Sequence, residues 1–174
     1  MVNIPDDVRA RVVSYIQHQG AKSKDGLADL VRTSQQRYVD VVAAVSDEIA
    51  AMKPAADEWS IRELTRHVAT TERFVADLIW HSARGQEPPP RPGGIGMTIA
   101  DDARPFVGWV AELRDANAKM LETILGLPDA PDIAIKPAHP FFGPLNCREW
   151  AAFQRVHDED HVQHACKILA AIGG

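Results

Sequence analysis

The sequence predicts an all-α protein, a four-helix bundle with long crossover loops and a short extra helix at its N-terminus. Three observations favour this fold. Apolar residues recur every three or four positions over four long stretches, which is the period of a helix with one buried face. Two of these stretches begin with a helix-capping signal. No segment alternates apolar and polar residues convincingly, as a half-buried strand does.

The chain has 174 residues, enough for one domain with a core of its own. We expect residues 1–26 to form an N-terminal helical extension and residues 27–174 to form the bundle domain. In the extension, a helix over residues 5–19 opens with Pro5 in its first turn and carries Val8, Val12 and Ile16 on one stripe. Gly20 and the polar residues after it end this helix.

The first bundle helix is expected over residues 27–51, because its apolar residues keep offsets of three, four and seven until Pro54 stops it. The second begins at the capping box of Ser60 and Glu63 and runs to about Ala83. The third covers about Asp102 to Gly126.

The fourth bundle helix begins at a second cap-plus-glutamate pair, Asn146 and Glu149, and runs to about Ala171. Proline-rich irregular stretches, residues 85–96 and 128–144, precede the third and fourth helices. Loops of this length at the end of a bundle often cover a site.

Charge and composition exclude several classes of partner. The net charge is −5 and no basic tract is present, so we expect no nucleic-acid partner. Neither a signal peptide nor an apolar run of about 20 residues is present, which predicts a cytoplasmic protein without membrane association. Cys147 and Cys166 fall about 28 Å apart on one predicted helix, too far for a disulfide. This also fits a reducing compartment.

The placement of the histidines carries most of the functional information. On a helical wheel centred on His157, both His161 and His164 lie within about 40°, whereas four charged residues lie about 100° or more away: Arg148, Arg155, Asp158 and Glu159. His67 faces inward on the second helix by the same test. Two histidines one turn apart with a third on a facing helix are typical of a metal site in a bundle core.

The alternative is that these histidines are core residues, each hydrogen-bonded to a backbone carbonyl. We assign the remaining histidines, His18, His81 and His139, to the surface or to loops. The segment from His157 to His161 differs from the H-E-x-x-H pattern of zinc proteases, because Asp158 follows the first histidine where that chemistry needs glutamate.

Two longer motifs add a family resemblance. Trp59-Ser60-x-x-Glu63-x-x-x-His67, and Phe142-Gly143-Pro144-Leu145-Asn146-x-x-Glu149-Trp150 ahead of His157-x-x-x-His161, resemble the DinB-like superfamily of metal-binding four-helix bundles over residues 27–172. The resemblance implies a divalent metal, with His67, His157 and His161 as ligands. Zinc and nickel both suit imidazole ligands. His164 stands where many members carry glutamine, and we expect a cofactor-binding role for it, as a fourth ligand, a hydrogen-bond donor behind the ligands or a substrate contact.

The same resemblance implies an enzyme that is either a low-molecular-weight-thiol S-transferase or a hydrolase. A three-histidine site leaves one position open, at which thiol or water is activated against a small electrophile. Arg84 and Arg91 are candidates to contact a charged thiol cosubstrate. The non-enzymatic alternative is a bundle that only binds a metal or a small ligand. A small-molecule partner is expected in each case, and a homodimer agrees with general frequency and with the family.

Overall fold

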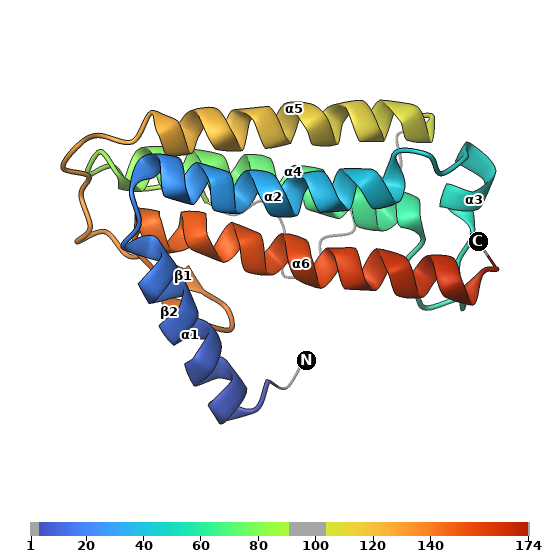
Figure 1. Ribbon diagram of the computed structural model, residues 1–174, viewed down its shortest axis with the longest axis horizontal. Helices are drawn as coiled ribbons and strands as arrows, with labels where there is room; N and C mark the ends of the chain where they lie inside the picture. Colours follow the sequence, from blue (N-terminus) through green and yellow to red (C-terminus); the bar gives the residue numbers. More distant parts are fainter. Residues whose placement is uncertain (1–3, 91–103, 174) are drawn as a thin grey trace.

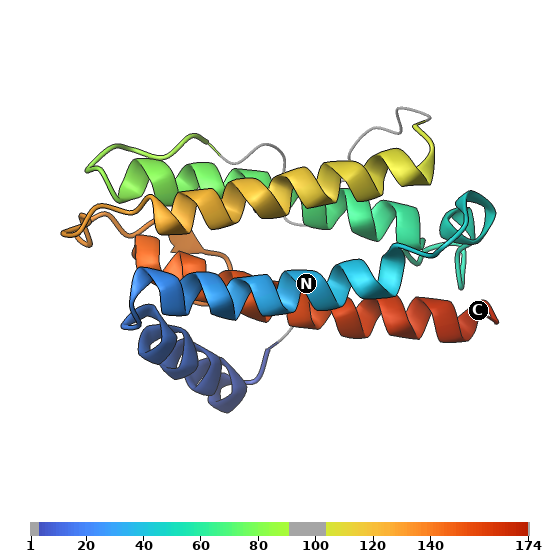
Figure 2. The same cartoon turned by 45° about the horizontal axis from the view of Figure 1, so that its top comes forward.

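The computed structural model describes residues 4–90 and 104–173. Within these residues lie α1 (Asp6–Gly20), α2 (Lys24–Val42), α3 (Asp47–Ala51), α4 (Ile61–Ser82), α5 (Phe106–Leu125), β1 (Ala138–His139), β2 (Gly143–Pro144) and α6 (Cys147–Ala171). The four long helices α2, α4, α5 and α6 run side by side, which confirms the predicted fold class (Figures 1 and 2). None of the helices in the described part of the chain has the length and apolar character needed to cross a membrane.

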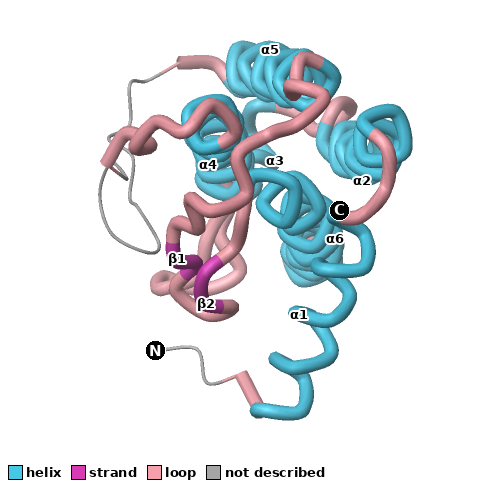
Figure 3. Tube along the Cα trace, turned by 90° about the vertical axis from the view of Figure 1, so that its left-hand side faces the viewer, coloured by secondary structure: helices cyan, strands magenta, loops and turns pink. Residues whose placement is uncertain are grey.

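The order of helices around the bundle differs from their order in the sequence. Each of α2 and α4 packs against both α5 and α6, so α2 and α4 occupy opposite corners (Figure 3). This arrangement makes α6 a neighbour of both α2 and α4. The histidine-bearing faces of α4 and α6 therefore lie against each other, although some 90 residues separate them in the sequence.

The prediction of one helix over residues 27–51 was wrong. Helix α2 ends at Val42, and the chain restarts at α3, where Ser46 Oγ accepts a hydrogen bond from the amide N–H of Ile49. Valine, which is frequent at the end of α2, is a weak helix former. Serine is one of the most favourable N-cap residues, because its hydroxyl accepts a hydrogen bond from an amide of the first turn. The local capping signal at Ser46 thus outweighed the apolar period that runs through it.

Both predicted capping boxes are present, and they fix where the two histidine-bearing helices begin. Ser60 Oγ accepts from the amide of Glu63, whose carboxylate accepts from the amide of Ser60. Asn146 and Glu149 make the same reciprocal pair at the start of α6. Spacings of three and four residues put the histidines of each helix on a shared face, and these caps mark where the two helices start.

Helix α1 packs against the outer side of α6 and projects from the bundle at an angle (Figure 1). Its C-terminal end is held tightly: Ile16 is fully buried, and the Arg148 side chain donates to the backbone carbonyls of Gly20 and Lys22. Nearer its middle, Arg155 of α6 donates to the Tyr15 hydroxyl. The N-terminal half of α1 is left free to line a cavity.

A buried polar layer divides the core into two apolar clusters. It consists of the buried side chains of Ser34, Gln35, Glu72, Gln154 and Asp158, together with the half-buried Asn117 of α5. Burial raises the pKa of Asp158 to about 7. Burial together with the nearby Asp158 carboxyl raises the pKa of Glu72 well above its ordinary value. Both acids therefore favour their neutral forms more than exposed carboxyls do.

Asp158 was predicted to face outward, and that prediction was wrong: its side chain is buried and hydrogen-bonds to Ser34 and Gln154. The helical wheel assumes one buried face for each helix. Helix α6 instead packs against α2 on one side and α4 on another, with α1 on a third, so most of its circumference is covered.

The irregular stretch over residues 128–144 contains the two-residue strands β1 and β2, paired antiparallel with His139 opposite Gly143. Gly143 has a φ of +76°, a conformation that side chains with a Cβ rarely adopt. The tight turn this permits places Phe142 near Phe153 of α6, with ring centroids 5.9 Å apart. The expected start of the third long helix at Asp102 and the second half of the 85–96 loop lie outside the described residues, and α5 begins at Phe106.

Candidate metal centre

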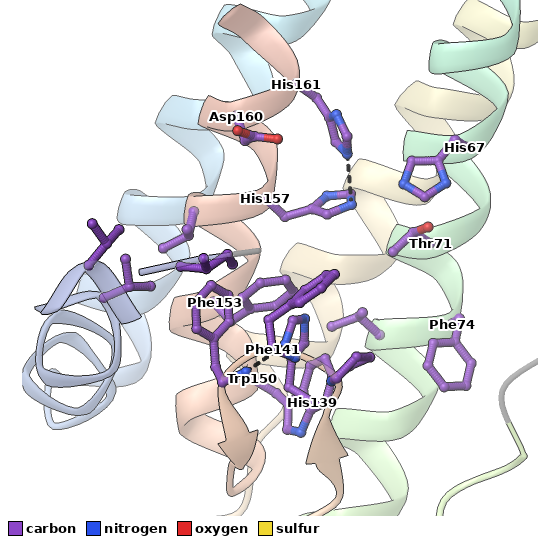
Figure 4. A pocket seen from close by; sticks show the side chains of 17 residues that line it. His67, Thr71, Phe74, His139, Phe141, Trp150, Phe153, His157, Asp160 and His161 are labelled. Carbon is purple, nitrogen blue, oxygen red and sulfur yellow. Dashed lines mark hydrogen bonds between the residues drawn. The ribbon is translucent and has the colours of Figure 1, made fainter. Parts of the chain in front are cut away.

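His67 of α4 and His157 and His161 of α6 converge on one point between the two helices (Figure 4). One ring nitrogen from each residue lies within 4.8 Å of those of the other two. The Nε2 atoms of His157 and His161 are 3.1 Å apart. The structure thus brings together the three side chains that the sequence marks as candidate ligands.

The geometry and protonation of these rings fit a divalent ion. With bonds of 2.0–2.1 Å from zinc to nitrogen, two tetrahedral imidazole ligands place their nitrogens about 3.3 Å apart, close to the observed separation of the two Nε2 atoms. Burial lowers the pKa of His161 far below its ordinary value, and the neighbouring His157, His67 and His164 lower it further. His161 is therefore neutral at physiological pH and has a lone pair to offer a metal.

His164 lies beside this trio rather than within it. Its ring stacks on Trp59 with centroids 6.2 Å apart, and its centroid is 6.3 Å from that of His161. Trp59 also meets the His67 ring edge-on, at 5.0 Å. Among the described residues, the group of potential metal ligands that lie close together consists of the other three histidines and does not include His164. The expected cofactor-binding role of His164 remains a prediction.

A cavity of about 430 Å³ adjoins the trio, between α4 and α6 (Figure 4). Its walls are mostly apolar and come from α1, α4, α6 and the turn between β1 and β2. Besides the histidines, the lining includes the polar side chains of Thr71 and Asp160 and the indole of Trp150. None of the described lining residues is a lysine or arginine.

His139 was assigned to the surface or a loop, and the assignment to the surface was wrong. It is 8% exposed and lies among Phe142, Trp150 and Phe153, with the Phe153 ring centroid 4.3 Å away. Its Nδ1 accepts hydrogen bonds from the amides of Phe141 and Phe142, so Nδ1 carries no proton. The aromatic and proline residues that flank it in the sequence were the available signal for its burial.

Thr71 lies one turn after His67 on the same face of α4, as the helical wheel indicates. It is 6% exposed, and its hydroxyl has no hydrogen-bond partner among the described residues. A buried hydroxyl in such a position costs free energy unless a ligand or water satisfies it.

Arg84 does not line the cavity. Its guanidinium donates to the carbonyls of Trp80 and Gly126 and lies 3.2 Å from the centroid of the Trp80 ring. It therefore ties the end of α4 to the end of α5, and contributes no charge to the histidine site. Arg91, the other arginine considered for that role, lies outside the described residues.

Comparison with known proteins identifies similar chains. A family model described as the DinB superfamily matches residues 30–165. A solved structure of YfiT from Bacillus subtilis, described as a probable metal-dependent hydrolase with an unusual four-helix bundle topology, is 14% identical with a TM-score of 0.62, covering 99% of this chain and 92% of YfiT. A second, TT2238, described as a four-helix bundle protein, is 20% identical with a TM-score of 0.59, covering 82% of this chain and 99% of that one. No curated protein matches the chain at a significant level.

Proposed function

This chain belongs to the DinB superfamily, and from that premise we propose that it is a divalent-metal-dependent hydrolase of a small-molecule substrate. One observation carries the proposal: three imidazoles from α4 and α6 each place one ring nitrogen within 4.8 Å of those of the other two, at the wall of a cavity. The description of YfiT as a probable metal-dependent hydrolase supports the same class of reaction, at the level of a shared fold.

His67, His157 and His161 would hold the ion, with zinc or nickel as the metals that best suit three nitrogen ligands. Bound by three ligands with one position left open, a divalent ion is a Lewis acid that makes water a stronger nucleophile at neutral pH. Each ligand is an uncharged imidazole, so the chain leaves the positive charge of the ion uncompensated and its Lewis acidity high.

The other polar groups of the cavity supply binding and proton transfer. The Thr71 hydroxyl, one turn from His67, donates a hydrogen bond to a polar atom of the substrate. The Asp160 carboxylate lines the cavity between the two histidines of α6 in sequence, and it accepts the proton that an attacking water gives up. The aromatic walls limit access of bulk water to the bound substrate.

Water is favoured over a thiol as the nucleophile because of the charge of the lining. Glutathione and many other cellular thiols carry carboxylates, which a binding site usually meets with arginine or lysine. Neither residue type occurs among the described lining residues, so the described side chains offer the carboxylates of such a cosubstrate no counter-charge besides the metal ion itself. The experiment below distinguishes hydrolysis from thiol S-transfer.

The experiment compares the untagged protein with the double variant His157→Ala/His161→Ala. Each is purified without chelator, loaded with zinc or nickel, and assayed on uncharged aryl esters and on haloaromatic or epoxide electrophiles, with and without added thiols. Metal-dependent ester hydrolysis that needs no thiol, lost in a double variant that still folds, supports the proposal. Turnover only in the presence of thiol identifies an S-transferase instead. Full metal occupancy without any turnover identifies a metal- or ligand-binding protein.

A further inference from the structure

The cavity beside the histidines is closed largely by hydrocarbon. Val8 and Val12 line it from α1, Phe74 from α4, Phe142 from the turn and Phe153 from α6. A volume of about 430 Å³ lies within the range of sites for small organic ligands. Aromatic rings on several sides favour a ligand whose body is itself aromatic or branched, because such surfaces gain most from leaving water together.

In the chain without metal, the charges of the described lining disfavour anions. Apart from the histidines, Asp160 is the one ionisable side chain in the described lining. It lies at the same end of the cavity as His157 and His161. No described lysine or arginine reaches the lining to neutralise a carboxylate or phosphate on the ligand. An anionic group placed among the aromatic walls would therefore lose its hydration without gaining a counter-charge.

Besides the histidines, Thr71 offers an uncharged hydrogen-bonding group at the cavity. Thr71 Oγ1 is buried and has no hydrogen-bond partner among the described residues, and it lies one turn from His67 on the cavity side of α4. A carbonyl oxygen of a ligand would accept from this hydroxyl and lie next to the three imidazoles (Figure 4).

We infer that the cavity takes an uncharged ligand with an aromatic or branched apolar body and one carbonyl head group, an ester or amide, whose oxygen meets Thr71. The assignment of the ester or amide as the group to be cleaved rests on the proposed hydrolase function. The exclusion of anions and the apolar body rest on the lining alone. Binding to the chain without metal therefore tests the ligand class independently of catalysis.

The test uses pairs of ligands that match in size and differ in charge: phenylacetamide, 3-phenylpropanamide and 4-phenylbutanamide, each beside the corresponding carboxylate. Binding to the full chain is measured by calorimetry and by tryptophan fluorescence, since Trp150 lines the cavity. In the metal-free chain, the best amide should bind at least about tenfold more tightly than its carboxylate. Equal or tighter binding of the carboxylates, or binding of none of the amides, overturns the inference.

Two pairs of variants locate the ligand. Thr71→Val should weaken amide binding about three- to tenfold, while Thr71→Ser, which keeps the hydroxyl, should not. Val8→Asp places a carboxylate on the cavity face of α1 and should weaken binding about tenfold or more, whereas Ser14→Asp places one on an exposed position of the same helix. Equal effects within either pair of variants, each checked for folding by circular dichroism, count against this placement.

Hydrolysis is measured separately on the zinc-loaded chain with the phenyl-substituted alkanoic acid methyl esters. Amide binding without ester hydrolysis would refute the hydrolase proposal and leave the ligand class standing. Hydrolysis of small hydrophilic esters without binding of any phenyl amide would refute the ligand class and leave the hydrolase proposal standing.

Discussion

The Nε2 atoms of His157 and His161 lie 3.1 Å apart on successive turns of α6. Two imidazole nitrogens at that distance need something between their lone pairs, either a proton on one ring or a shared cation. In the chain without metal, one ring donates to the other, and a divalent ion would take the place of that hydrogen bond. The rings are thus arranged for a metal before one binds, which limits the cost of reorganisation.

The first prediction concerns metal content. Protein purified without chelator should contain about one equivalent of a divalent ion, and His157→Ala/His161→Ala should contain almost none, because a single remaining imidazole is a weak ligand. Elemental analysis by mass spectrometry measures both. His164→Ala is the matched control from the same helix and should keep the ion. Loss of metal in that control would instead make His164 a ligand.

The second prediction concerns Glu72 and pH. Burial and the nearby Asp158 raise its pKa in the folded chain, while the unfolded chain titrates near the ordinary value of 4.5. Between these two pKa values the folded state holds a proton that the unfolded state has lost, so the free energy of unfolding falls as pH rises. Glu72→Gln should remove this part of the slope, so the variant should become more stable relative to the parent as the pH rises from 5 to 8.

Urea unfolding at several pH values measures this slope. Glu58→Gln is the control, since Glu58 is exposed and the same change of charge there should leave the slope as it is in the parent. Parallel pH profiles for the parent and Glu72→Gln would mean that the buried carboxyl is ionised in the folded chain, contrary to the expectation from its burial.

The features that could be predicted from the sequence are those fixed by residues close together in the chain. Ser60 with Glu63, and Asn146 with Glu149, set the starts of α4 and α6 through hydrogen bonds that span three residues. Once those starts are fixed, the helical period alone puts His67 on one face of α4 and both histidines on one face of α6.

The features that were missed depend on which elements pack together. Asp158 is buried because α2 covers the side of α6 that a single-faced helix would expose to water. His139 is buried because the turn between β1 and β2 folds back onto Trp150 and Phe153. Neither contact follows from the helical period, and for His139 the flanking aromatic and proline residues were the one local signal.

The third prediction separates stability from metal binding. Ser60→Ala removes the oxygen that accepts the Glu63 amide and should lower the free energy of unfolding by about 1 kcal/mol. Ser60→Thr keeps the oxygen and should cost less. Because folded chains of either variant still have the same three histidines, metal content per folded molecule should match the parent. A fall in that ratio for Ser60→Ala alone would mean that the cap also positions His67.

The fourth prediction links zinc to folding through His67, the one candidate ligand on α4. A ligand that binds only the folded chain stabilises it, by about 2.7 kcal/mol at a free concentration 100 times Kd. Zinc should therefore raise the midpoint of thermal unfolding of the parent, and His67→Ala should lose most of that rise because α4 no longer contributes a ligand. The exposed His18→Ala on α1 is the control and should respond as the parent does. An undiminished rise in His67→Ala would place the zinc on α6 alone, and a metal held by one helix would not draw α4 and α6 together.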